Sequence, residues 1–131
     1  MKQLTVLVPN EPGQFAKIAE ILAAQNINIE DADVETHGAD GLINLTVDKY
    51  DDALRALSSS GYRAVTQDTL LVRIEDRPGG LAVVAARLKD AGLDLRSMHI
   101  IRRTGTHSIA SLVSSDNAKA AAVLKDVILG G

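Results

Sequence analysis

The sequence predicts an α+β protein built from two copies of a βαββαβ unit, each an antiparallel sheet with both helices on one face. The first observation is an internal repeat. A shift of 66 positions aligns residues 4–47 with 70–113 without a gap, and nine of the 44 aligned positions are identical. The second is helical spacing, because apolar residues recur at i, i+3, i+4 and i+7 in both copies: Phe15, Ile18, Ala19 and Leu22, then Leu81, Val84, Ala85 and Leu88.

Local signals place each element. Apolar runs bounded by turn residues predict strands, and the helical period predicts helices. The first repeat, residues 1–66, has strands at 3–8, 27–35, 42–47 and 62–66 and helices at 13–25 and 51–59. The second repeat, residues 67–131, has strands at 70–75, 93–102, 107–113 and a short 127–129, with helices at 79–91 and 116–126. Asn26 and Gly92 follow the first helix of each copy, where a left-handed residue closes a helix.

Two features of the strands lead to further expectations. In the second strand of each copy the apolar alternation slips by one, between Ile29 and Ala32 and between Leu95 and Met98, which predicts a β-bulge. The link between residues 62–66 and 69–75 is very short. It leaves open a hairpin between these two strands, with residues 127–129 returning to complete the first sheet.

Composition excludes several classes of protein. The chain has 131 residues, is 46% hydrophobic and 24% charged, and so has enough apolar material for a packed core. It has no Cys, which excludes disulfides, zinc–thiolate sites and cysteine nucleophiles. A net charge of −3 and only three aromatic residues argue against nucleic-acid binding. No apolar run approaches the roughly 18 residues that cross a membrane, so we expect a cytoplasmic protein without membrane contact.

No catalytic motif is recognisable. The three histidines form no HxxxH or HExxH spacing, the serine run at 58–60 lacks a GxSxG elbow, and HGADG lacks the length and lysine of a phosphate loop. We therefore expect neither catalysis nor a cofactor nor a bound metal.

The repeated turn that opens each first helix is the main candidate site. NEPGQFA begins at Asn10 and DRPGGLA at Asp76. The first turn of a helix has unpaired N–H groups and partial positive charge, and glycine lets a carboxylate approach that backbone. Asn10 and Asp76 are suited to accept from a ligand ammonium. The same residue types are also ordinary N-caps, and glycine also serves turns, so a purely structural role stays open.

These motifs, with NINI and LDLR entering the next strand, resemble the ACT domain, present twice across nearly the whole chain. The resemblance implies a ferredoxin-like fold in each copy and a tandem ACT protein without an attached catalytic domain. It also implies regulation by a small effector, most often an amino acid. The ligand of such a domain lies between the first loop of one domain and the second-strand edge of another. The implied ligand-binding residues are Asn10, Glu11, Pro12, Gly13, Gln14, Phe15, Asn28 and Ile29, and Asp76, Arg77, Pro78, Gly79, Gly80, Leu81, Asp94 and Leu95.

The expected partners follow from the same interpretation. They are a small-molecule effector, a biosynthetic enzyme or regulator, and a second copy of the chain. Apolar residues outside the predicted helix faces, at 82, 83 and 86 and at 120–124, predict a homodimer with an extended antiparallel sheet. The alternative is an interaction or dimerisation module that keeps the fold and binds no ligand.

Overall fold

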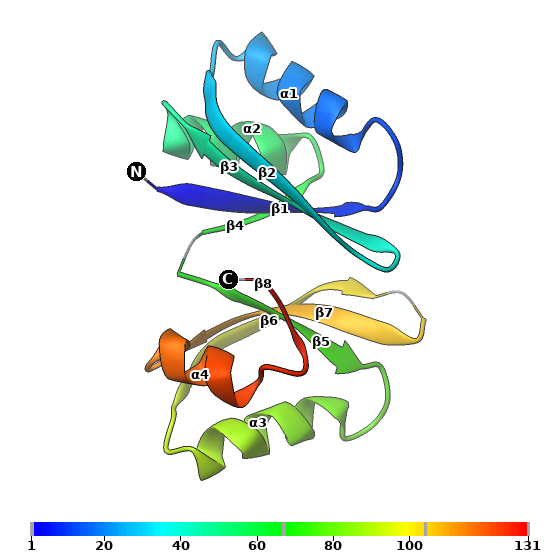
Figure 1. The fold of residues 1–131 in the computed structure, drawn as a ribbon, viewed down its shortest axis with the longest axis vertical. Helices are drawn as coiled ribbons and strands as arrows, with labels where there is room; N and C mark the ends of the chain where they lie inside the picture. The colour runs from blue at the N-terminus through cyan, green and yellow to red at the C-terminus, as the bar shows by residue number, and fades with distance from the viewer. Residues whose placement is uncertain (1, 67, 104, 131) are drawn as a thin grey trace. The chain divides into compact units, whose positions relative to one another are not determined.

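The first of two units, Met1–Gln67, is a four-stranded antiparallel sheet with two helices on one face (Figure 1). The computed structural model describes residues 2–66, 68–103 and 105–130. The elements of this unit are β1 (Gln3–Pro9), α1 (Gln14–Ala24), β2 (Ile29–His37), β3 (Asp40–Val47), α2 (Tyr50–Ser59) and β4 (Arg63–Thr66). The strand order is β2-β3-β1-β4.

The second unit, Asp68–Gly131, repeats this topology with the order β6-β7-β5-β8. Its elements are β5 (Leu70–Glu75), α3 (Gly80–Asp90), β6 (Leu95–Arg103), β7 (His107–Ser114), α4 (Asn117–Val123) and β8 (Ile128–Gly130). The predicted fold class is confirmed. No helix among the described residues has the length and apolar character needed to span a bilayer.

Each unit has its own core between sheet and helices. In the first unit, Ile18 and Leu22 of α1 and Leu57 of α2 pack against Leu4 and Val6 of β1. All five side chains are fully buried, and each such burial stabilises the fold by roughly 1.5–3 kcal/mol. The second core has the same plan, with Leu88 of α3 and Leu124 of α4 on Val72 of β5. Because Ile18 and Leu22 fix α1 on the sheet, they also fix the start of α1 and the loop that joins it to β1.

The predicted bulges and helix ends are confirmed. The register of β2 on β3 shifts between Ile29 and Asp31, and that of β6 on β7 shifts between Leu95 and Ser97. Asn26 has φ 57° and Gly92 has φ 74°. Both residues therefore adopt the left-handed conformation that ends a helix.

A second register shift in β6, between Ile100 and Arg102, has no counterpart in β2. The gapless alignment of the two repeats is therefore wrong beyond this point, because the second repeat has one extra residue there. Leu4 pairs with Leu45, whereas Leu70 pairs with Leu112. The third strands are therefore related by 67 positions and not by 66, so the sequence identities found there do not mark equivalent sites.

The strand exchange left open by the short link does not occur. β4 pairs with β1 in its own unit, and β8 pairs with β5. Gln67, in the link, lies outside the described residues.

The last helix is shorter than predicted, ending at Val123 rather than at residue 126. The N–H groups of Val127 and Ile128 bond to the carbonyl of Leu124, and the N–H of Arg73 bonds to the carbonyl of Val127 at 2.8 Å. The chain must leave the helix early because residue 127 has to reach β5. Ala120 and Leu124, which we expected on an uncovered surface, are buried in the core.

Candidate functional site

Gly13 and Gly79 are the N-cap residues of α1 and α3, and each has φ 86°. Only glycine adopts this left-handed conformation readily, so the turn itself requires the glycine of the repeated motif. Neither helix has a side-chain cap among the described residues. The alternative that Asn10 and Asp76 act as N-caps is therefore wrong.

Asn10 instead joins the β1–α1 loop to the turn between β2 and β3. Its N–H donates to the carbonyl of Ala39 and its Nδ2 donates to the carbonyl of Gly38, both at 2.9 Å. No described residue donates a hydrogen bond to the side-chain oxygen of Asn10. These two hydrogen bonds fix the β1–α1 loop, and the side-chain oxygen of Asn10 can still accept a hydrogen bond from a ligand.

The start of α1 provides donors beside this acceptor. The N–H of Lys17 bonds to the carbonyl of Gly13, the first bond of the helix. The N–H groups of Gln14, Phe15 and Ala16 precede it and have no acceptor among the described residues. Unpaired N–H groups at the first turn of a helix can bind an anion.

A hollow of about 160 Å³ lies against this loop. Five predicted residues line it, namely Asn10, Glu11, Gly13, Gln14 and Phe15. The sequence interpretation missed the residues contributed by the strands, which are Val8, Pro9, Val34, Thr36, Gly41 and Ile43. The slip in the β2 pattern was the available signal, because after the bulge Val34 pairs with Ile43 and shares the face of the sheet that carries the helices.

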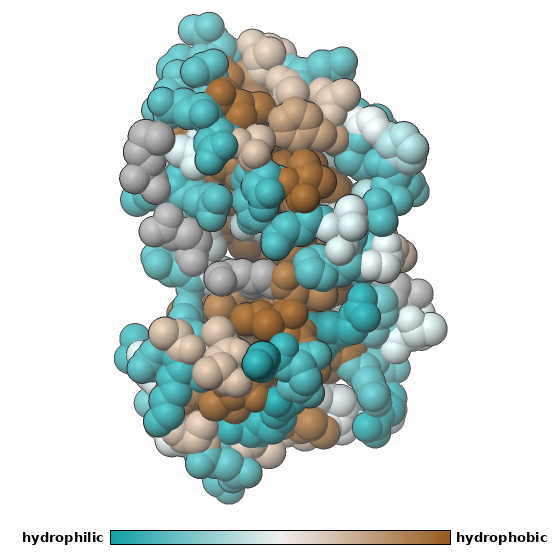
Figure 2. Space-filling model, viewed as in Figure 1, coloured by the Kyte–Doolittle hydropathy of each residue, from teal (hydrophilic) through white to brown (hydrophobic). Residues whose placement is uncertain are grey.

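Two of the side chains that line the hollow are apolar and exposed. Phe15 is 39% exposed and Val34 is 54% exposed, high values for residues of their size. In the second unit, Leu81 and Ile100 occupy the corresponding positions and are also exposed. Figure 2 shows hydrophobic side chains reaching the surface among hydrophilic ones in both units.

Asn28 and Ile29 lie elsewhere within the unit. Ile29 pairs with Val47 at one end of the sheet, whereas the loop follows Pro9, which pairs with Asp40 at the other end. The backbone of Asn28 exchanges hydrogen bonds with Asp48. Asp94 is held in the same way by Ser115, and its neighbour Leu95 begins β6. These four predicted residues, Asn28, Ile29, Asp94 and Leu95, therefore lie at the end of their own sheet that is opposite the glycine loop.

The loop of the second unit has different chemistry. Nη1 of Arg103 donates to Asp76 at 2.9 Å. This carboxylate, expected to meet a ligand ammonium, therefore already has a cation. The guanidinium of Arg77 pairs with Glu75. The sequence pattern predicted neither of these two ion pairs.

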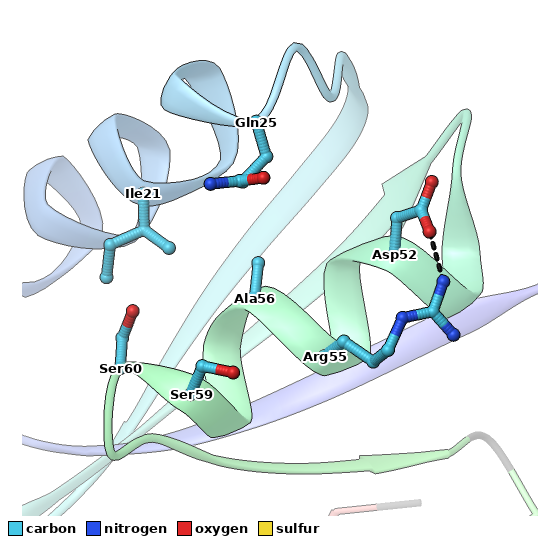
Figure 3. Close-up of a pocket in the computed structure, with 7 residues that line it drawn as sticks. All are labelled: Ile21, Gln25, Asp52, Arg55, Ala56, Ser59 and Ser60. Atoms are coloured by element: carbon cyan, nitrogen blue, oxygen red, sulfur yellow. Dashed lines mark hydrogen bonds and ion pairs between the residues drawn. The ribbon is translucent and has the colours of Figure 1, made fainter.

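A further hollow in each unit contains few or none of the predicted residues. In the second unit one of about 320 Å³ includes Arg77 and Gly80 of the predicted set. In the first unit one of about 430 Å³ lies between α1 and α2 (Figure 3). Its charged residues, Asp52 and Arg55, pair with each other on the exposed surface of α2. The groove between α1 and α2 therefore shows no unmatched charge for a ligand.

The guanidinium of Arg87 donates to the carboxylate of Asp126 and holds the pKa of that carboxyl below its ordinary value, with nearby positive charge adding to the effect and desolvation opposing it.

Comparison with known proteins agrees with this geometry. The family model of the ACT domain matches residues 2–59. The match therefore covers most of the first unit, Met1–Gln67. The second unit, which the family model does not cover, has the same strand order and the same glycine-capped helix start, so the chain contains the predicted repeat of one fold.

Solved structures show a similar fold over most of the chain. Protein BT0572 from Bacteroides thetaiotaomicron is 25% identical, with 98% of this chain and 91% of that chain covered at a TM-score of 0.50. The regulatory subunit of aspartate kinase from Thermus thermophilus is 20% identical, with 95% and 87% covered at a TM-score of 0.45. Among curated proteins, none matches the sequence.

Proposed function

We propose that this protein is a non-catalytic regulatory module that binds a free amino acid and passes its binding state to a partner protein. The ACT domain match supports the regulatory role. The observation that carries the proposal is the hollow beside the first-unit loop, where helix-start donors, a polar acceptor and apolar side chains meet.

Each part of an amino acid has a matching group there. The carboxylate fits the unpaired N–H groups at the start of α1. The ammonium fits the side-chain oxygen of Asn10, and the side chain fits the apolar surface of Phe15 and Val34. Roughly 0.5 kcal/mol for each of about ten heavy atoms gives a sub-millimolar Kd, a range suited to sensing a metabolite pool.

The size of the hollow supports a binding site shared between two protein surfaces. Its volume of about 160 Å³ is below the roughly 300 Å³ at which ordinary ligand pockets begin. An amino acid in it therefore needs a second surface, which a homodimer supplies. Ala82, Val83 and Ala86 of α3 are exposed and keep the dimer prediction in place. Light scattering at tens of micromolar should give twice the mass of one chain, and a monomer would contradict this prediction.

A thermal-shift screen with the twenty amino acids identifies the effector, because a ligand that binds the folded state raises its stability. Calorimetry on Phe15→Glu then tests the site. The new carboxylate lies at the start of α1, so it repels the carboxylate of the ligand, and we expect at least a tenfold loss of affinity. Leu81→Glu is the matched control, since Leu81 is the exposed counterpart in the second unit. It should leave the affinity unchanged.

The alternative is an interaction module that binds no ligand. It is favoured by the apolar pairs exposed in both units, Phe15 with Val34 and Leu81 with Ile100. If none of the twenty amino acids raises the melting temperature, and both glutamate variants reduce the dimer mass, this alternative replaces amino-acid sensing.

A further inference from the structure

The second unit has an apolar hollow with a charged rim, separate from the hollow beside the first-unit loop. Its volume is about 320 Å³, and it lies on the face of the sheet that carries α3, next to the segment that leads into β8. The walls are formed by Ile74, Val83, Val84 and Val127. Charged residues at the rim include Arg77 and Arg87, with Glu75 and Asp126.

The first unit has a buried polar side chain at the start of its first helix. Gln14, at the position that matches Gly80, is 9% exposed. Its side chain lies between the hydroxyl of Tyr62, at 3.4 Å, and the carboxylate of Glu11, at 3.5 Å. Gly80 provides no side chain, and the backbone of Glu75 lies where its Cβ would be, so no polar side chain from this position enters the hollow of the second unit.

Two donors face the hollow. Nε of Arg77 donates to Glu75, and its two terminal nitrogens have no acceptor among the described residues. The N–H of Arg73 bonds to Val127 on the β8 side of β5. Alternate residues of an antiparallel strand point their N–H groups to the same edge. The N–H of Glu75 therefore points to this edge too, beyond the end of β8, and β8 does not reach it.

The other rim charges are already matched. The guanidinium of Arg87 donates to the carboxylate of Asp126 and to the carbonyl of Val123. The carboxylate of Glu75 is paired with Arg77. The unmatched groups are therefore donors, which favours an anion, and the walls favour an aliphatic body.

We propose that this hollow binds a small branched aliphatic carboxylate of about five or six carbons. The carboxylate lies against Arg77 and the N–H of Glu75, and the branched chain packs on Val84 and Val127. The volume is near the lower end of ligand pockets, which suits a ligand of this size. An α-amino group is not required, because no free carboxylate faces the site. This second site does not depend on the amino-acid site of the first unit.

The test is a titration of the full chain with 4-methylpentanoate, followed by amide NMR. We expect saturable shifts of the Ile74, Val84 and Val127 amides at millimolar ligand. Acetate, which lacks the branched chain, and 3-methylbutylamine, which lacks the carboxylate, should bind at least tenfold more weakly. Leucine distinguishes an amino acid from a simple carboxylate and should bind no more tightly than 4-methylpentanoate.

Two variants locate the site. Arg77→Gln removes the anion donor and Val83→Glu adds a repelling charge, and each should weaken binding at least tenfold. The side chain of Arg77 is 60% exposed and Val83 is 52% exposed, so both variants should keep the dispersed spectrum of the folded protein. Arg55→Gln removes a comparable exposed arginine, paired with Asp52 in the first unit, and should have no effect.

The outcomes are decisive in both directions. Shifts at β5 and α3 that are lost in both variants and kept in Arg55→Gln establish the site. Equal binding of acetate, binding of leucine alone, or unchanged affinity in Arg77→Gln overturns it. Because 4-methylpentanoate has no ammonium group and the readout lies in the second unit, failure here leaves the first-unit test with Phe15→Glu unaffected.

Discussion

The two units share a topology but differ at the residue that follows the N-cap glycine, where the first has Gln14 and the second Gly80. In the first unit a buried glutamine and Tyr62 fill the space beside β1. In the second unit the loop backbone lies so close that a Cβ on Gly80 would be 2.2 Å from the carbonyl oxygen of Glu75. The two units therefore have the same strands and helix starts. They differ in the residue after the N-cap glycine, and the hollow beside the loop is lined by different strands in the two units.

The largest expected effect comes from Gly80→Ala. Helix propensity alone predicts a gain of about 1 kcal/mol, because alanine is the better helix former. The 2.2 Å approach to a backbone atom predicts the opposite, since the backbone must shift. We expect a loss of about 3 kcal/mol in unfolding free energy, in the range of strained, overpacked sites. Urea denaturation measures it, and amide hydrogen exchange should localise it to the second unit.

The matched change in the first unit is Gln14→Ala. The native residue there already has a Cβ, so no backbone clash arises, and the loss of its packing should cost only about 1 kcal/mol. A comparable loss in both variants would show that the two loops do not differ in the way described.

The glycines at the helix starts should respond alike. Gly13 and Gly79 both have φ 86°, and a Cβ at either position meets nothing within 4 Å. Substitution by alanine therefore costs only the left-handed backbone conformation, roughly 1–2 kcal/mol in each unit. Asparagine should cost less at both positions, because it tolerates that conformation. Urea midpoints that differ strongly between Gly13→Ala and Gly79→Ala would contradict this symmetry.

The symmetric features are the ones that the sequence predicted well. The bulges and the left-handed helix ends depend on residues close together in the chain, such as Ile29 with Asp31 or Asn26 after its helix, and period and turn chemistry reveal them. The glycine at the start of each helix was recognised for the same reason.

The features that distinguish the two units depend on contacts across long stretches of chain. Arg103 reaches Asp76 over 27 positions, and Tyr62 reaches Gln14 over 48. The close approach of Gly80 to Glu75 depends on the path of the loop backbone. No local pattern encodes these contacts, so the strand side of the first hollow and all but two residues of the second were missed.

The smallest expected effect concerns the ion pair between Arg87 and Asp126, which ties α3 to the segment before β8. The first unit has Ile21 at the position of Arg87 and no equivalent pair among the described residues. The hydrogen bond from Arg87 lowers the pKa of Asp126 in the folded state. The folded protein thus favours the ionised carboxylate, whose contribution to stability is fully present above the unfolded-state pKa.

That contribution should be lost as the pH falls below about 4 and passes through the lowered pKa of Asp126. Carboxyl-carbon NMR should show Asp126 titrating at a lower pH in the folded protein than in urea. In Arg87→Gln the two titrations should lie closer together, and the dependence of urea stability on pH below 4 should weaken while the rest of the curve keeps its shape. The side chain of Asp126 is exposed at the surface, so salt screens the pair and the difference should shrink at high ionic strength. A titration of Asp126 that is the same in wild type and Arg87→Gln would show that the tie does not act electrostatically, and the two units would then differ only in how the space beside their first strands is filled.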